Sequence, residues 1–236
     1  MTAEPLSQPA PDRRQRRRQE TIEEVLDIAV EIMATDGVAG LSLGEVARRM
    51  GIRPPSLYVY FPSKLALYDA LFARGARQVH DVMAEAYGRM LEEATSFEDY
   101  LYTTSATYIR WRVSHPVYSQ LLYWRPVPGF TPSEEAYAPA VAMVQQAIGV
   151  FREMQQRGWL RDDVPAEDIF RDWTVITSGV SSQQMSNAPD ESFEQGRFTS
   201  ALPGLVAMFI RHYGASPTPA TVRRHGNVAK RTARKR

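Results

Sequence analysis

The chain has 236 residues, of which 44% are hydrophobic and 23% are charged, as is usual for a globular protein. It contains no cysteine, which excludes a disulfide scaffold, a thiolate zinc site, an iron–sulfur cluster and a cysteine nucleophile. No stretch is apolar for the roughly 18 residues that a membrane span needs, and acidic residues follow the N-terminal arginines where a secretory signal would be apolar. We therefore expect a cytoplasmic protein with no membrane partner.

The net charge of +1 hides an asymmetry between the ends and the body of the chain. Five arginines against two acids in residues 1–18, and seven basic residues without an acid in residues 215–236, give the two ends a charge of +10. Residues 19–214 then carry −9. Blocks of like charge often form interaction tails, so the basic ends indicate a polyanionic partner, with solubility as the alternative. Both ends also lack an apolar period, and we expect a disordered basic arm over residues 1–16 and a disordered basic tail over 215–236.

The region between these ends has helical periodicity throughout. Apolar spacing predicts helices over 22–36, 42–50, 54–60, 64–90, 97–115, 116–123, 137–157, 165–185 and 193–213, with a proline-rich loop over 124–132. Pro203 and Gly204 interrupt the last of these, so we expect a kink or a break there. No segment alternates as a strand does. The predicted fold class is all-α, with about nine helices.

A short stretch of the chain has the features of a helix-turn-helix. Ser42 followed by Glu45 is the pattern of a capping box, which would start a helix at Leu43. Gly51 permits the left-handed backbone of a sharp turn, and Pro54 suits the first turn of a second helix. Such a corner leaves the second helix free to enter a major groove. The alternative is an ordinary two-helix corner in an α-helical core.

The residues after this corner carry a family resemblance. The stretch Leu57–Lys64, LYVYFPSK, resembles the TetR-family hallmark Leu-Tyr-x-(His/Tyr)-Phe-x-(Ser/Asn)-Lys at every fixed position. The resemblance to these bacterial transcriptional regulators is strong over residues 18–75 and weaker over the remaining helices. It implies an N-terminal three-helix helix-turn-helix DNA-binding domain, expected over 17–64, and a C-terminal helical ligand-binding and dimerisation domain, expected over 65–214. It also implies a homodimer that binds a pseudo-palindromic operator in double-stranded DNA.

The resemblance implies DNA contacts for residues at and after the turn. Those expected at base edges are Pro54, Pro55, Ser56 and Val59, and those expected at phosphates are Tyr58, Tyr60 and Lys64. Arg53 precedes the second helix and is expected at a guanine or a phosphate. Hydroxyl and ammonium groups bind phosphate oxygens and fix the register without reading sequence. The two prolines and Val59 offer carbon surface, which favours contacts with thymine methyl groups. For the prolines, simple helix initiation is the alternative.

The expected C-terminal domain is rich in aromatic residues. Buried tyrosines need partners for their hydroxyls, and such rings on neighbouring helices often line a small-molecule pocket, with core packing as the alternative. The candidate ligand-binding residues, chosen on helices that surround the family's pocket, are Met83, Tyr87, Tyr100, Thr104, Tyr108, Trp111, Tyr123, Tyr137 and Trp173. No carboxylate or histidine cluster lies among them, so we expect a largely apolar effector.

Catalysis is the competing class of function. None of the four histidines lies in an HExxH, GxSxG, P-loop or dinucleotide-binding pattern, so we expect no catalytic residue, metal or cofactor. The sequence thus predicts a sequence-specific DNA-binding regulator that is not an enzyme, most simply a repressor released from its operator by a small ligand. The alternative is a DNA-binding regulator that is constitutive or responds to another protein.

Overall fold

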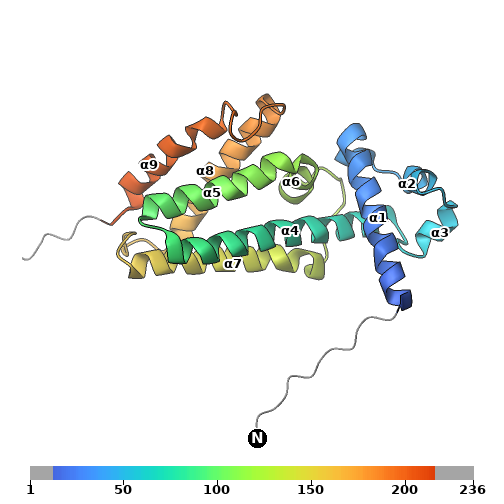
Figure 1. Cartoon of the computed structure of the whole chain (residues 1–236), viewed down its shortest axis with the longest axis horizontal. Helices are drawn as coiled ribbons and strands as arrows, with labels where there is room; N and C mark the ends of the chain where they lie inside the picture. Colours follow the sequence, from blue (N-terminus) through green and yellow to red (C-terminus); the bar gives the residue numbers. More distant parts are fainter. Residues whose placement is uncertain (1–12, 216–236) are drawn as a thin grey trace, which may run out of the picture.

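A computed structural model describes residues 13–215, which form nine α-helices and two short 3₁₀ helices (Figure 1). The elements are α1 (Arg13–Asp36), η1 (Val38–Gly40), α2 (Leu43–Arg49), α3 (Pro54–Tyr58), α4 (Lys64–Glu93), α5 (Phe97–Ser114), α6 (Pro116–Tyr123), α7 (Glu134–Gln156), α8 (Ala166–Asn187), η2 (Thr199–Ala201) and α9 (Leu202–Tyr213). The described residues contain no strand, only an isolated bridge between Leu160 and Gly214. The all-α fold class is therefore confirmed.

The helices are arranged around one long element. Figure 1 shows α1, α2 and α3 grouped at one end of the molecule, with α4 running from this group into a larger helical body. Within that body α4 lies along α7 and packs on α5 and α6, while α8 and α9 pack on α5. Helix α4, which has 30 residues, thus begins in the first group of helices and continues through the larger body.

Buried side chains form a large cluster at each end of α4 and a small one between them. The first cluster unites α1–α3 with Leu67, Tyr68 and Leu71 of α4 and with Leu121 of α6. The second unites α5, α7, α8 and α9. The domain boundary expected between residues 64 and 65 therefore cuts through the first cluster, because the first turns of α4 pack with α1–α3.

Helix α1 starts earlier than expected. It begins at Arg13, so the expected disorder is wrong over residues 13–16. Arginine is a good helix former, and the buried face from Val25 to Met33 anchors the same helix, which extends toward its N-terminus. The remainder of the expected arm, residues 1–12, and the expected tail over 216–236 lie outside the described residues.

The expected capping box at the start of α2 is wrong. Ser42 is the N-cap residue, but its side chain makes no capping hydrogen bond. The Glu45 carboxylate instead accepts hydrogen bonds from Arg48 (2.7 and 2.8 Å) and Arg49 (2.9 Å), which lie one turn further along. Two charged donors compete better for the carboxylate than one backbone amide does, and they lower the pKa of Glu45 to about 2.

The interruption expected at Pro203 is the beginning of a helix. Helix α9 starts at Leu202, so the helix expected over 193–213 is broken just before Pro203, which lies in the first turn of α9; of the two expected outcomes, the break is confirmed and the kink is wrong. The missing N–H of a proline costs nothing in a first turn, where amides have no partner within the helix. The chain between α8 and α9 is instead an irregular loop followed by η2.

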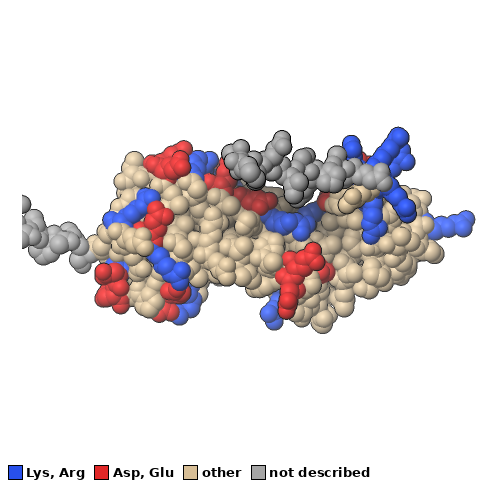
Figure 2. Space-filling model, turned by 90° about the horizontal axis from the view of Figure 1, so that it is seen from below, with Lys and Arg blue, Asp and Glu red and all other residues tan. Residues whose placement is uncertain are grey.

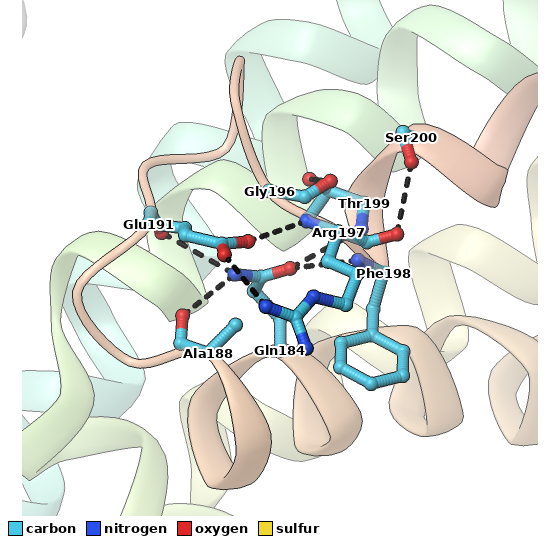
Figure 3. A network of polar contacts seen from close by, with 8 residues as sticks. All are labelled: Gln184, Ala188, Glu191, Gly196, Arg197, Phe198, Thr199 and Ser200. Carbon is cyan, nitrogen blue, oxygen red and sulfur yellow. Dashed lines mark hydrogen bonds and ion pairs between the residues drawn. The ribbon is translucent and has the colours of Figure 1, made fainter.

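One buried side chain fastens this loop to α8. Gln184 has no solvent exposure, and its amide group points from α8 into the loop (Figure 3). Its Nε2 donates to the carbonyl oxygen of Ala188 (2.7 Å), and its Oε1 accepts from the backbone N–H of Phe198 (3.0 Å). Because η2 and α9 follow directly, Gln184 fixes where α9 begins.

Replacing Gln184 by alanine is expected to lower the free energy of unfolding by about 2–4 kcal/mol. The substitution leaves buried backbone groups without partners and opens a cavity. The control is Gln183→Ala, which removes an exposed side chain bonded only to Asn187 and is expected to change stability by less than about 0.5 kcal/mol. Urea denaturation of both variants measures the difference, and equal losses would contradict the role given to Gln184.

Candidate DNA-binding surface and ligand pocket

The α2–α3 corner has the geometry of a helix-turn-helix. Gly51 ends α2 with φ at +68°, the left-handed conformation expected from the sequence. The backbone N–H of Ile52 then donates to the carbonyl oxygen of Ala47 (3.0 Å), which closes the turn. Ala47 and Leu57 are buried and hold the two helices together, so the outer side of α3 is left uncovered.

The predicted DNA-contact residues lie on this uncovered segment. Exposed members are Arg53, Pro54, Pro55, Ser56, Tyr58, Val59 and Lys64, and Tyr60 is half-buried. Helix α3 ends at Tyr58, two residues before the expected end. The N–H of Tyr60 closes a tight turn on the carbonyl oxygen of Leu57 (2.9 Å), which directs the chain toward Pro62. Val59, at 70% exposure, therefore projects from the end of the helix.

The start of α4 carries a second feature of this surface. The Ser63 hydroxyl accepts a hydrogen bond from the N–H of Ala66 (3.1 Å), as expected for an N-cap. The Lys64 ammonium donates to the carbonyl oxygen of Ala39 (3.1 Å) in η1. Lys64 therefore fastens α4 to the turn between α1 and α2, a structural role that sequence reasoning did not identify.

Helix α1 adds a basic face next to α3. Its first turns and the end of the corner line one groove, formed by Arg13, Arg14, Arg17, Arg18, Thr21, Val59 and Tyr60. The Arg18 guanidinium lies 5.4 Å from the ring centre of Tyr60. Figure 2 shows Lys and Arg side chains projecting from this end of the molecule. The signal was present in the sequence, since residues 13, 14, 17 and 18 have the spacing of one helical face.

Arg16 lies on a different side of α1. It lines a surface with Glu20, Glu23, Glu24 and Asp27, where the surrounding charge is acidic. Among the described residues, the five N-terminal arginines are therefore divided between a basic face without acidic neighbours, the unopposed basic face, and a side with several acidic neighbours. This division depends on α1 being helical, and a disordered arm would not produce it.

A cavity in the helical body gathers most of the predicted ligand-binding residues. It has a volume of about 150 Å³ and lies among α4, α5, α6, α7 and α8. The predicted residues that line it are Met83, Tyr87, Tyr100, Thr104, Tyr108, Tyr123 and Trp173. A cavity of this size and apolar character accommodates a compound of about one ring.

Two predicted residues do not reach the cavity. Trp111 packs in the small central cluster, with its ring stacked on His115 (4.7 Å between ring centres) and near Tyr118 (6.5 Å). Tyr137 is half exposed at the start of α7, where its ring lies 5.9 Å from that of Phe72. Helical spacing places both on apolar faces, but α6 covers Trp111, and Tyr137 lies at the end of α7 that packs against the first core.

Sequence reasoning missed other parts of the cavity wall. The additional lining residues are Leu101, Ser105, Met143, Val144, Ala147, Phe151, Phe170, Thr174 and Thr177. Ser105 and Trp173 are joined across the wall, since the indole Nε1 donates to the serine hydroxyl oxygen (2.9 Å). Small and aliphatic residues carry no sign in the sequence that distinguishes a cavity from a packed core.

The tyrosines of the cavity are hydrogen-bond donors. Burial raises the pKa of Tyr87, Tyr100 and Tyr123 above the ordinary value for a phenol, with neighbouring tyrosines adding to the effect. Their hydroxyls are therefore protonated at neutral pH. Among residues 13–215 no carboxylate or histidine lines the cavity, so its wall is apolar with a few donating hydroxyls.

Comparison with known proteins assigns the chain to a family. Residues 25–71, from the buried part of α1 to the first turns of α4, match the model of bacterial regulatory proteins of the tetR family. An uncharacterised HTH-type transcriptional regulator YobS of Bacillus subtilis is 37% identical over 62 residues, 26% of this chain and 32% of its own. The class D tetracycline repressor protein of Escherichia coli is 36% identical over 66 residues, 28% of this chain and 30% of its own. The chain belongs to the TetR family.

The TetR fold extends over the whole described structure. A TetR-family transcription regulator from Marinobacter aquaeolei superimposes with a TM-score of 0.62 at 17% identity, covering 85% of this chain and 99% of that one. The sequence matches, in contrast, span about a third of either curated relative, and the family match ends before the cavity begins. A weaker sequence match extends into the body, since the HTH-type transcriptional regulator Rv1816 of Mycobacterium tuberculosis is 25% identical over 187 residues, 79% of this chain and 72% of its own.

TetR-family proteins are transcription regulators, which agrees with the function class expected from the sequence. Within residues 13–215, no helix combines the length and apolar character that a membrane crossing requires. The same residues hold no group of three or more acidic or histidine side chains suited to a metal ion.

Proposed function

We propose that this TetR-family regulator is a homodimeric repressor that leaves its operator when a small, largely apolar ligand fills the cavity. The observation that carries the proposal is the continuity of α4. Tyr68 of this helix is buried in the core of the helix-turn-helix, and Met83 and Tyr87 line the cavity. A rigid helix that touches both places transmits a displacement from one to the other.

The DNA-binding unit in this proposal consists of α1–α3 with the first turns of α4. The outer side of α3 would enter a major groove, with Arg53 to Ser56 at base edges. Tyr58, Tyr60 and Lys64, together with the basic face of α1, would bind the flanking phosphates. The support is the shared exposure of these residues and the basic groove beside them.

The dimer in this proposal forms through α8 and α9. These helices carry two large apolar side chains that are well exposed, Val175 at 68% and Met208 at 47%. Burial of such side chains between two copies of the chain would stabilise a two-fold pair. The pair would then place its two α3 helices in successive major grooves, about 34–36 Å apart.

Arg74 offers a second connection between the cavity and the DNA-binding unit. Its guanidinium, on α4, donates to the hydroxyl of Tyr118 on α6 (2.6 Å). It also pairs with Asp27 (2.7 Å) and Glu23 (3.2 Å) of α1. Because α6 ends at Tyr123 in the cavity wall, a ligand that displaces α6 would strain this junction and shift α1.

The proposed function is tested by thermodynamic reciprocity. Genome-wide mapping of bound sites supplies the operator, and a thermal-shift screen supplies a ligand. A coupling free energy of about 1–3 kcal/mol would weaken operator binding by roughly 5- to 150-fold, and operator DNA must weaken ligand binding by the same factor. Calorimetry of the ligand with and without operator measures that factor. Equal affinities would exclude the inducer role and favour a regulator that is constitutive or responds to another protein.

A further inference from the structure

A buried arginine lies directly behind the cavity wall. Arg112 of α5 is only 1% exposed. The carbon at the centre of its guanidinium lies 4.1 Å from the ring centre of Tyr123 and 5.6 Å from that of Tyr108, and both rings line the cavity. Its positive charge therefore lies behind the part of the cavity wall that Tyr108 and Tyr123 form.

This charge has no counterion among residues 13–215. No carboxylate forms an ion pair with Arg112, and its Nε and Nη1 atoms are buried without a hydrogen-bond acceptor. Contact with two aromatic faces offsets only part of the free-energy cost of burying a cation. The folded protein thus holds a positive charge that an anion would stabilise.

The cavity wall also has an excess of donors. The hydroxyl of Tyr100, which lines the cavity, is buried without a hydrogen-bond partner in the described part of the chain. Trp173 directs its only donor to Ser105, so the Ser105 hydroxyl hydrogen remains to be donated. Protonated tyrosines and a nearby guanidinium favour a ligand that accepts hydrogen bonds and carries negative charge.

We propose that the effector of this cavity is an organic acid, with its apolar part in the cavity and its carboxylate hydrogen-bonded by the tyrosine hydroxyls and stabilised by the charge of Arg112. This proposal rests on the proposed function for the place of binding, and it adds the chemical class of the ligand. At about 150 Å³ the cavity holds a single ring or a short alkyl chain without rearrangement.

The test compares matched probes on the full chain by thermal shift. Benzoate is paired with benzylamine and benzyl alcohol, and octanoate with octylamine and octanol. We expect a carboxylate to raise the melting temperature more than its amine and its alcohol do. Equal or larger shifts with the amine or the alcohol, or no shift with either carboxylate at millimolar concentration, would overturn the proposal.

Variants separate the charge of Arg112 from its packing. Arg112→Met is expected to weaken carboxylate binding about tenfold or more while leaving the stability of the free protein unchanged or raised, because it removes an unpaired buried charge. The control is Arg110→Met on the same helix, whose guanidinium is exposed and pairs with Glu194 (2.9 Å), and it should retain the full response. Equal carboxylate affinity in the two variants would contradict the role of Arg112.

Tyr100→Phe tests the tyrosine donors in a variant that is expected to fold normally. It removes a hydroxyl that has no partner, so the free protein should keep its stability while binding the carboxylate more weakly. Unchanged carboxylate affinity in this variant would contradict the proposed hydrogen bond from the Tyr100 hydroxyl to the carboxylate. Operator release is measured in the same samples. A carboxylate that binds without weakening DNA binding would refute the inducer function alone, whereas an amine that releases DNA would refute the organic acid alone.

Discussion

Replacing Arg13, Arg14, Arg17 and Arg18 together by alanine is expected to weaken DNA binding at least about a hundredfold at low salt. These side chains form the unopposed basic face of α1 beside Val59 and Tyr60. Each phosphate contact contributes about 0.9 to the slope of log K against log salt, so the slope should fall by up to about 3.6. Alanine preserves the helix, which confines the effect to charge. Fluorescence anisotropy of labelled duplex DNA at several salt concentrations measures the slope.

Arg16→Ala is the matched control for this experiment. Arg16 occupies the same helix but lines the acidic side, next to Glu20 and Glu23. Its removal should change the slope by less than one phosphate contact. If the slope of log K against log salt falls by the same amount per arginine in both variants, the N-terminal charge acts as a whole, irrespective of its position on the helix. The assignment of a DNA-facing side of α1 would then be wrong.

Gly75→Ala is expected to lower the free energy of unfolding by about 1–3 kcal/mol. A Cβ at this position would lie 2.6 Å from Cδ1 and 3.1 Å from Cγ of Tyr118. These atoms belong to the base of the ring, so relief requires α6 to move away from α4. Urea denaturation monitored by circular dichroism measures the loss.

Gly88→Ala on the same helix is the control for Gly75→Ala. Gly88 is exposed, and nothing lies within 4 Å of the added methyl group, so the variant should gain up to about 1 kcal/mol from helix propensity. The two variants should therefore differ in sign. If Gly75→Ala were also stabilising, α4 and α6 would not be closely packed at Tyr118. The connection proposed there between the cavity and the DNA-binding unit would then be wrong. If Gly75→Ala is destabilising as expected, it should also disturb the hydrogen bond from Arg74 to Tyr118 and so alter the response of DNA binding to a ligand.

The sequence by itself determined the local features of the DNA-binding unit. The helical class follows from apolar periodicity, and the turn at Gly51 follows from the freedom of glycine at positive φ. The N-cap at Ser63 is likewise local, since it depends on residues within one turn. The family hallmark over residues 57–64 is also a short contiguous motif, and together with the preceding helix-turn-helix corner it made the family recognisable from the sequence.

Tertiary structure decided which residues share a site. Periodicity predicted that Tyr100, Tyr108 and Trp111 all lie on buried faces of α5, but in the folded protein Trp111 packs against Tyr118 of α6 and does not line the cavity. The capping box failed because Arg48 and Arg49 compete for Glu45, a competition among side chains that a motif does not contain. The sequence also could not predict that Arg112 is buried without a counterion among the described residues. Whether a buried cation has a counterion depends on residues that are distant in the chain and brought together only by folding.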